Sequence, residues 1–136
     1  MMSDSWFPRL NSMARDPALE ITERFDALID EYFLVFSNPE SSAFAFEVLT
    51  LAESEPFAAR IVFDLEQRYT QLIATMVEQM NHTLSQGERW LRASLIVAHA
   101  GGLLVFCRLS NKTEAEMVNL KHSTRELWSA LCLAPR

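Results

Sequence analysis

Glycine, proline and cysteine are scarce in this chain, which has three, five and two of them among 136 residues. Few glycines and prolines argue against a turn-rich β fold, and a hydrophobic content of 49% argues against disorder. The two cysteines, Cys107 and Cys132, lie in apolar surroundings, so we expect buried free thiols and no disulfide framework. We find no secretory n-region, h-region and cleavage site at the start and therefore expect a cytoplasmic protein.

Basic residues are also few. Twelve Lys and Arg stand against eighteen Asp and Glu, which gives a formal net charge of −6. Phosphate binding needs clustered cations, and the basic residues here form no stripe. We therefore expect no nucleic-acid binding by this chain alone.

The alternation of polar and apolar residues that is typical of strands is missing. From residue 16 onward, apolar residues instead recur at spacings of three and four, as in helices with one buried face. We predict an all-α fold, an antiparallel helical bundle of about five helices. One helical ligand-binding and dimerisation domain is expected over residues 16–136, with residues 1–15 as an N-terminal segment. The predicted helices are 16–36, 38–54, 55–80, 87–110 and 113–132.

Helix-start signals support these bounds. Asp16-Pro17 and Asn38-Pro39 each place a capping side chain before a proline, whose missing N–H costs nothing in the first turn. Thr113 and Glu116 have the spacing of a capping box at the start of the last helix.

The stretch Ala93–Cys107 carries no formal charge apart from that of His99 when it is protonated. The predicted helix 87–110 therefore has no polar face, and its own domain, a partner or lipid must cover it. Lipid is least favoured, because Arg92 and Arg108 bracket about 15 uncharged residues, whereas a spanning helix needs ~20. We predict a central or subunit-interface helix with more than one neighbour, and no membrane insertion.

The glycine pair Gly101-Gly102 in this helix indicates the close approach of another backbone, because a mid-helix glycine costs ~1 kcal/mol relative to alanine. The last helix has apolar residues at heptad-like spacing. Two such helices from each of two subunits would form a four-helix bundle, so we predict a homodimer. The alternative is that the last helix covers this side within the monomer. The predicted interface residues are Ala98, Gly101, Gly102, Val105, Leu120, Thr124 and Leu127.

Aromatic residues and methionines occur on four predicted helices, a set that suits an apolar chamber for a small ligand. Plain core packing is the alternative. His99 needs a hydrogen-bond partner in an apolar wall, so a partner within the fold or at a subunit contact is a further alternative for it. The predicted ligand-binding residues are Phe44, Phe63, Met76, Trp90, His99 and Phe106.

Motifs that would carry chemistry are missing. No histidine has a second His or Cys three or four residues away, so we predict no metal site and no cofactor. The sequence has no Gly-x-Ser-x-Gly turn and no glycine-rich phosphate loop, so we predict no catalytic residues and no enzyme. A small dimeric helical enzyme is the alternative, and it would direct charged side chains such as Arg60 or Arg68 with Glu47 into a cavity.

Three stretches of the chain follow a recognisable order. Residues 46–56 contain acids and end in the acid-proline break Glu55-Pro56, Ala93–Leu103 has spaced alanines and a Gly-Leu pair, and Glu114–Cys132 is a closing helix. This order resembles the C-terminal, effector-binding and dimerisation domain of the TetR family of bacterial transcriptional regulators. The resemblance covers about residues 16–132.

The resemblance implies a homodimeric domain that senses a small, largely apolar effector. Family members begin with a three-helix DNA-binding unit containing a helix-turn-helix, whereas about fifteen residues precede the first predicted helix here. The resemblance therefore implies a sensing and dimerisation domain without its own DNA-binding unit. A dimerising partner that inhibits a full-length regulator is a further alternative.

Overall fold

The computed structural model describes residue 12 and residues 15–136. Within these residues the chain forms α2 (Ile21–Ser37), α3 (Pro39–Leu51), α4 (Pro56–Met80), α5 (Gln86–Leu109) and α6 (Glu114–Leu133), and no strand. The predicted all-α bundle of about five helices is confirmed. Nearly all of the predicted N-terminal segment lies outside the described residues.

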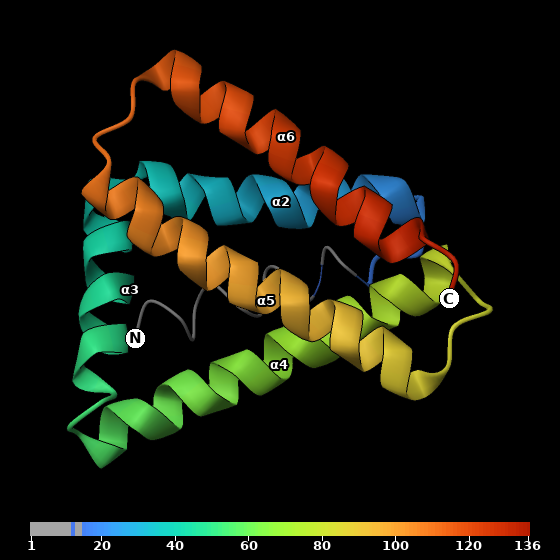
Figure 1. Ribbon diagram of the computed structural model, residues 1–136, viewed down its shortest axis with the longest axis horizontal. Coiled ribbons are helices and arrows are strands. Elements are labelled where there is room, and N and C mark those ends of the chain that lie inside the picture. The colour runs from blue at the N-terminus through green and yellow to red at the C-terminus, as the bar shows by residue number, and fades with distance from the viewer. Residues whose placement is uncertain (1–11, 13–14) are drawn as a thin grey trace.

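α5 is the central element of this bundle. Figure 1 shows α2, α4, α5 and α6 lying lengthwise, whereas α3 stands across them at one end. α3 is a short helix between two proline breaks, Pro39 and Pro56, which allow the chain to turn sharply at both of its ends. α5 contacts each of the other four described helices, which confirms the prediction that the uncharged helix meets more than one neighbour.

Two of the three predicted helix-start signals are confirmed. The side chain of Asn38 accepts a hydrogen bond from the backbone N–H of Ser41 at 3.0 Å and caps α3. Thr113 and Glu116 form a reciprocal capping box at α6, with both bonds at 3.1 Å. These side chains satisfy N–H groups that a helix cannot pair within its first turn.

The third predicted start, at Asp16-Pro17, is wrong. Asp16 Oδ1 accepts a hydrogen bond from the N–H of Ala18 at 2.9 Å, and the Asp16 carbonyl accepts one from Leu19 at 3.2 Å. These bonds close a turn, and α2 begins only at Ile21. An aspartate side chain that bonds the backbone two residues ahead stabilises a turn, and this local bond outcompetes the helical one here.

The core lies between α2, α4, α5 and α6. Each of these helices contributes side chains from one stripe at helical spacing, and Trp128 of α6 is 1% exposed among them. Burial of such side chains stabilises the fold by about 1.5–3 kcal/mol each. The largest fully buried residues are Trp128, Phe25, Leu28, Ile29, Leu72, Ile73, Met76, Ile96, Val77 and Cys132.

Polar groups attach the middle and the C-terminal end of α6 to the rest of the bundle. Near its middle, Arg125 pairs with Asp26 at 2.9 Å and with Asp30 of α2 at 3.3 Å. At its C-terminal end, the buried guanidinium of Arg92 donates to the carbonyl oxygens of Leu131, at 3.0 Å, and Ala134. These carbonyls have no partner within the helix, and Arg92 satisfies them together with Asn81, whose Nδ2 donates to the Ala134 oxygen at 3.1 Å.

Candidate functional site

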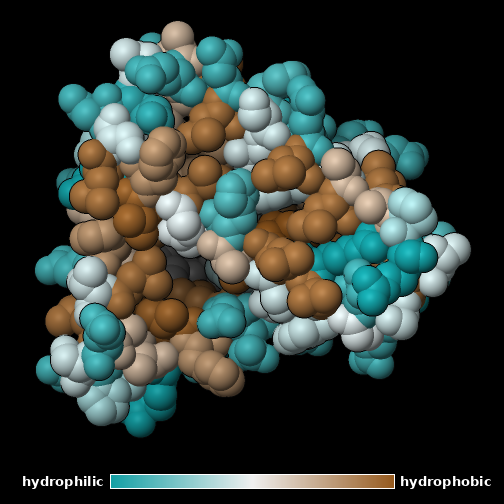
Figure 2. Space-filling view, viewed as in Figure 1, coloured by the Kyte–Doolittle hydropathy of each residue, from teal (hydrophilic) through white to brown (hydrophobic). Residues whose placement is uncertain are grey.

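A cavity of about 390 Å³ opens between α3, α4 and α5, with α2 contributing to its wall. Figure 2 shows the hollow on the face of the molecule seen in Figure 1, with hydrophobic residues around it. The volume falls within the roughly 300–1,000 Å³ of small-molecule sites. The cavity is the candidate functional site of the chain.

Small residues keep this space open. Ala45 on α3, with Ala98, Ala100 and Gly101 on α5, lines the cavity where longer side chains would fill it. A Cβ atom added at Gly101 would meet no other atom within 4 Å. The uncharged stretch of α5 therefore supplies one wall of a cavity as well as part of the core.

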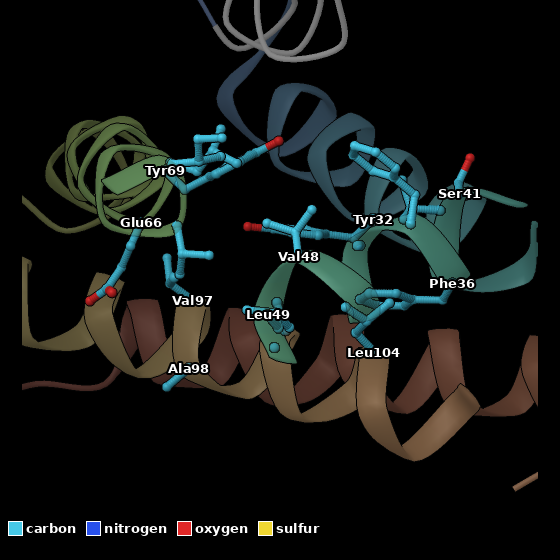
Figure 3. A pocket seen from close by; sticks show the side chains of 18 of the residues that line it. Tyr32, Phe36, Ser41, Val48, Leu49, Glu66, Tyr69, Val97, Ala98 and Leu104 are labelled. Carbon is cyan, nitrogen blue, oxygen red and sulfur yellow. The ribbon is translucent and has the colours of Figure 1, made fainter. Parts of the chain in front are cut away.

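The lining is predominantly aliphatic and aromatic. α4 contributes Ile61, Val62, Leu65 and Tyr69 at helical spacing. Figure 3 shows side chains of α3 and α5, among them Val48 and Val97, that line the same cavity. Such a wall favours an apolar ligand. The other apolar lining residues are Val35, Phe36, Phe44, Val48, Leu49, Val97 and Leu104.

Two buried tyrosines add hydroxyl groups to this wall. The rings of Tyr32 and Tyr69 converge from α2 and α4, with centroids 5.6 Å apart (Figure 3). Burial raises the pKa of both phenols, and for Tyr69 the nearby Tyr32 and Glu31 raise it further. Both phenols therefore stay neutral near pH 7 and can donate or accept hydrogen bonds.

Glu66 is the one charged side chain among the described residues that line the cavity. It is exposed, and Figure 3 shows it at the opposite end of the cluster from Ser41. Glu47, Arg60 and Arg68, named above as examples of charged residues that an enzyme would direct into a cavity, are exposed and do not belong to the lining. Within the described part of the chain, no group of three His, Cys, Asp or Glu is placed to hold a metal ion.

Of the six predicted ligand-binding residues, only Phe44 belongs to the described lining of this cavity. Met76 is 1% exposed in the core, so it packs as the alternative interpretation described. Phe63, Trp90 and Phe106 are exposed and do not belong to the lining, and the predicted grouping is corrected accordingly. These aromatic residues lie on helices that line the cavity. Consecutive residues of a helix point about 100° apart, so a residue next to a lining residue, such as Phe63 next to Val62, can be exposed.

His99, the sixth predicted residue, has its partner within the fold. Trp128 Nε1–H donates to His99 Nδ1 at 2.8 Å, and the two rings meet edge to face. This bond joins α5 to α6 outside the cavity. The interpretation of His99 as a residue with a hydrogen-bond partner inside the fold fits this geometry, and its place in a ligand cavity is corrected.

The polar lining residues Tyr32, Tyr69 and Glu66 are not among the ligand-binding residues that the sequence predicts. A hydroxyl on an otherwise apolar stripe was the signal that could have marked the two tyrosines, because a buried phenol needs polar surroundings.

The predicted dimer residues fall into an exposed, a half-buried and a buried group. Ala98 and Gly102 are exposed, Gly101, Val105 and Leu120 are half-buried, and Leu127 is 56% exposed. Thr124 is 3% exposed and faces the interior of its own chain, so its assignment to a subunit contact is corrected. The apolar face of α6 packs in part against the core of its own chain, as Leu120 and Leu131 show.

A row of apolar residues on α5 remains uncovered by the described part of the chain. We call it the α5 outer stripe; hydrophobic residues over α5 are visible in Figure 2. A Cβ atom at Gly102 would meet nothing within 4 Å, so the close approach expected at the glycine pair does not occur within the described chain. The α5 outer stripe consists of Leu91, Leu95, Ala98, Gly102, Phe106 and Leu109.

By length and composition α5 is apolar enough to cross a membrane, and it is the one such helix among the described residues. A third of that stretch is buried inside the molecule. A single helix of this kind is weak evidence for membrane insertion, because core helices pass the same test. The finding does show how much apolar surface α5 presents.

Comparison with known proteins identifies no relative. No protein-family model matches the chain, and neither the curated proteins nor the solved structures include a match.

Proposed function

We propose that this chain is a ligand-sensing and dimerisation domain of the kind that TetR-type transcriptional regulators carry. The observation that supports this most directly is that Ala98 belongs to two surfaces of the chain. It lines the apolar cavity and also belongs to the α5 outer stripe. A ligand and a partner subunit would therefore contact the same segment of α5.

The proposed ligand is a small, largely apolar molecule. The cavity is lined by aliphatic and aromatic side chains from four helices, with few polar groups to fix orientation. This combination is typical of small-molecule sites. The rival function, a helical enzyme, would need convergent charged groups, and an apolar lining with Glu66 alone does not favour it.

The proposed partner is a second copy of this chain. The α5 outer stripe has residues at the three- and four-residue spacing that lets two helices pack lengthwise. Ala98 and Gly102 at its centre permit close backbone approach, and exposed Leu127 on α6 extends the apolar surface. Two copies of α5 and α6 would form a four-helix contact, which is how a pair of identical faces closes a dimer.

In the proposed mechanism, ligand binding shifts a population of helix arrangements. A ligand that contacts α3, α4 and α5 prefers the arrangement that fits it best, and the free protein already samples that arrangement. Because α5 also carries the subunit contact, the change would reach the partner and the relative placement of the two copies. In a regulator, that placement decides whether two recognition elements match their half-sites on DNA.

Binding of N-phenyl-1-naphthylamine, a neutral fluorescent probe, tests the ligand site. We expect saturable binding of one probe per chain, and we expect Ala45→Phe, which fills the cavity, to weaken it at least tenfold. Ala115→Phe, at an exposed position of α6 outside the lining, should leave the affinity unchanged. Absence of saturable binding, or equal binding to Ala45→Phe, would contradict the proposed function.

A further inference from the structure

The charge distribution of the cavity is one-sided. Glu66 contributes a carboxylate, and no Lys or Arg belongs to the described lining. The remaining polar groups are neutral hydroxyls, from Ser41 and Ser94 and from the two tyrosines. Among the described lining residues, a ligand inside this cavity therefore meets a carboxylate and hydroxyl groups but no cation.

The chain around the cavity is acidic overall as well. The chain as a whole has a formal net charge of −6. An anionic ligand would approach an acidic protein and lose its hydration without a charge partner, which is costly. A cationic ligand gains a partner at Glu66.

Glu66 lies at the rim of the cavity. Its side chain is exposed and stands at one end of the labelled side chains in Figure 3, while the apolar lining extends from it toward Phe36 and Ser41. A charged group held at the rim keeps part of its hydration, so it can pair with an opposite charge without full burial. The cavity is thus polar at one end and apolar along its length.

We propose that the cavity binds an amphiphilic organic cation, with an apolar body among α2, α3, α4 and α5 and a single ammonium group at Glu66. This proposal rests on the proposed function, and it narrows a largely apolar effector to one chemical class. Ser94 and the two tyrosine hydroxyls add hydrogen-bond partners along the cavity but do not select charge.

Three probes with the same ten-carbon chain separate the contributions of charge and apolar surface. Decyltrimethylammonium, 1-decanol and decyl sulfate are titrated below their micelle concentrations into the full chain by isothermal calorimetry, with circular dichroism to show that the helices persist. We expect the ammonium to bind roughly two- to fivefold more tightly than the alcohol, the scale of a partly hydrated ion pair. The sulfate should bind most weakly, and 0.5 M salt should reduce the difference.

Glu66→Gln tests the carboxylate. It should remove the preference for ammonium over alcohol and leave the affinity for the alcohol unchanged. Glu47→Gln, at an exposed position of α3 outside the lining, is the matched control and should keep the preference. The same titrations with Ala45→Phe should weaken both probes, which assigns binding to this cavity.

The outcomes separate the two proposals. If alcohol and ammonium bind equally to the wild type, or if Glu66→Gln keeps the preference, the cation proposal is overturned while the apolar ligand site stands. Tighter binding of the sulfate overturns it as well. If none of the three probes binds, both the cation proposal and the proposed function fail.

Discussion

Trp128 and His99 form the one side-chain hydrogen bond between α5 and α6 that involves two rings in the described chain, with Nε1 donating to Nδ1 at 2.8 Å. An indole can only donate, so Nδ1 must be the unprotonated nitrogen of the imidazole. Trp128 is 1% exposed, and His99 is half-buried. The pair links the uncharged helix to the last helix beside the core.

Replacing His99 with phenylalanine should therefore destabilise the fold. The buried indole N–H would lose its acceptor, which costs about 1–3 kcal/mol. Urea unfolding, followed by tryptophan fluorescence and circular dichroism, measures the loss as a lower midpoint. His82→Phe, at an exposed position, is the control and should change the free energy of unfolding by less than about 0.5 kcal/mol.

A double variant sharpens this test. In His99→Phe with Trp128→Phe, no donor is left without an acceptor, so the hydrogen-bond part of the loss should disappear. The double variant still loses the larger indole, which costs packing free energy. A coupling free energy near zero in this double-mutant cycle would contradict the importance of the bond.

Arg92 should matter more than any exposed cation of α5. Its guanidinium is buried, pairs with Glu88 at 3.1 Å and donates to carbonyls at the end of α6. Arg92→Met would leave those carbonyls and the Glu88 carboxylate without this donor, and we expect a loss of roughly 2–4 kcal/mol. Thermal unfolding measures it, with Arg108→Met at an exposed position as control. Equal melting temperatures for the two variants would contradict the prediction.

The sequence was sufficient to predict the helices because helix formation is governed by local patterns. Apolar spacing, the Asn38 cap and the capping box at Thr113 all act within a few residues, and each is present in the structure. The turn at Asp16 shows the limit of this reasoning, since the same residues can close a turn or start a helix. Whether these residues form a turn or a helix depends on which local hydrogen bonds they make, and here Asp16 bonds the N–H of Ala18.

The cavity was harder to predict because it depends on how helices pack. Its lining joins residues of α2 and α5 that are far apart in the sequence, and its space arises where Ala45 and Gly101 leave room. The predicted ligand-binding residues are mostly large and aromatic, whereas small side chains create the space of this cavity. Ala98 and Gly101, which are predicted only for the subunit contact, both line the cavity.

Alkaline pH should destabilise the protein through its buried acids. Burial raises the pKa of the Cys132 thiol from 9.0 to about 12, and it raises those of Tyr32 and Tyr69 in the same direction. Above pH 9 the unfolded chain releases protons that the folded chain keeps, so the free energy of unfolding falls as pH rises. The full stability is present below about pH 9 and is lost progressively toward pH 12.

Urea unfolding at several pH values measures this slope. Cys132→Ala removes one of the buried acids, so stability should fall less steeply between pH 9 and 11 than in the wild type. Cys107→Ala is the comparison, because Cys107 is only half-buried and nearby Lys112 opposes the rise of its pKa. A slope for Cys132→Ala that is as steep as the wild-type slope would refute the assignment.

The proposed subunit contact makes a prediction that separates assembly from folding. Gly102 is exposed, lies outside the cavity lining, and has no neighbour that a Cβ atom would meet within the described chain. Gly102→Leu should therefore stabilise an isolated subunit by about 0.5–1 kcal/mol, because leucine is a better helix former. In a dimer that packs on the α5 outer stripe, the same leucine would hold the two backbones apart, and sedimentation equilibrium should show monomers at concentrations where the wild type is dimeric.

Gly87→Leu, in the first turn of α5, is the control and should leave the dimer intact. A Gly102→Leu dimer as stable as the wild type would exclude this face of α5 from the contact, and a wild-type protein that stays monomeric at high concentration would exclude the dimer itself.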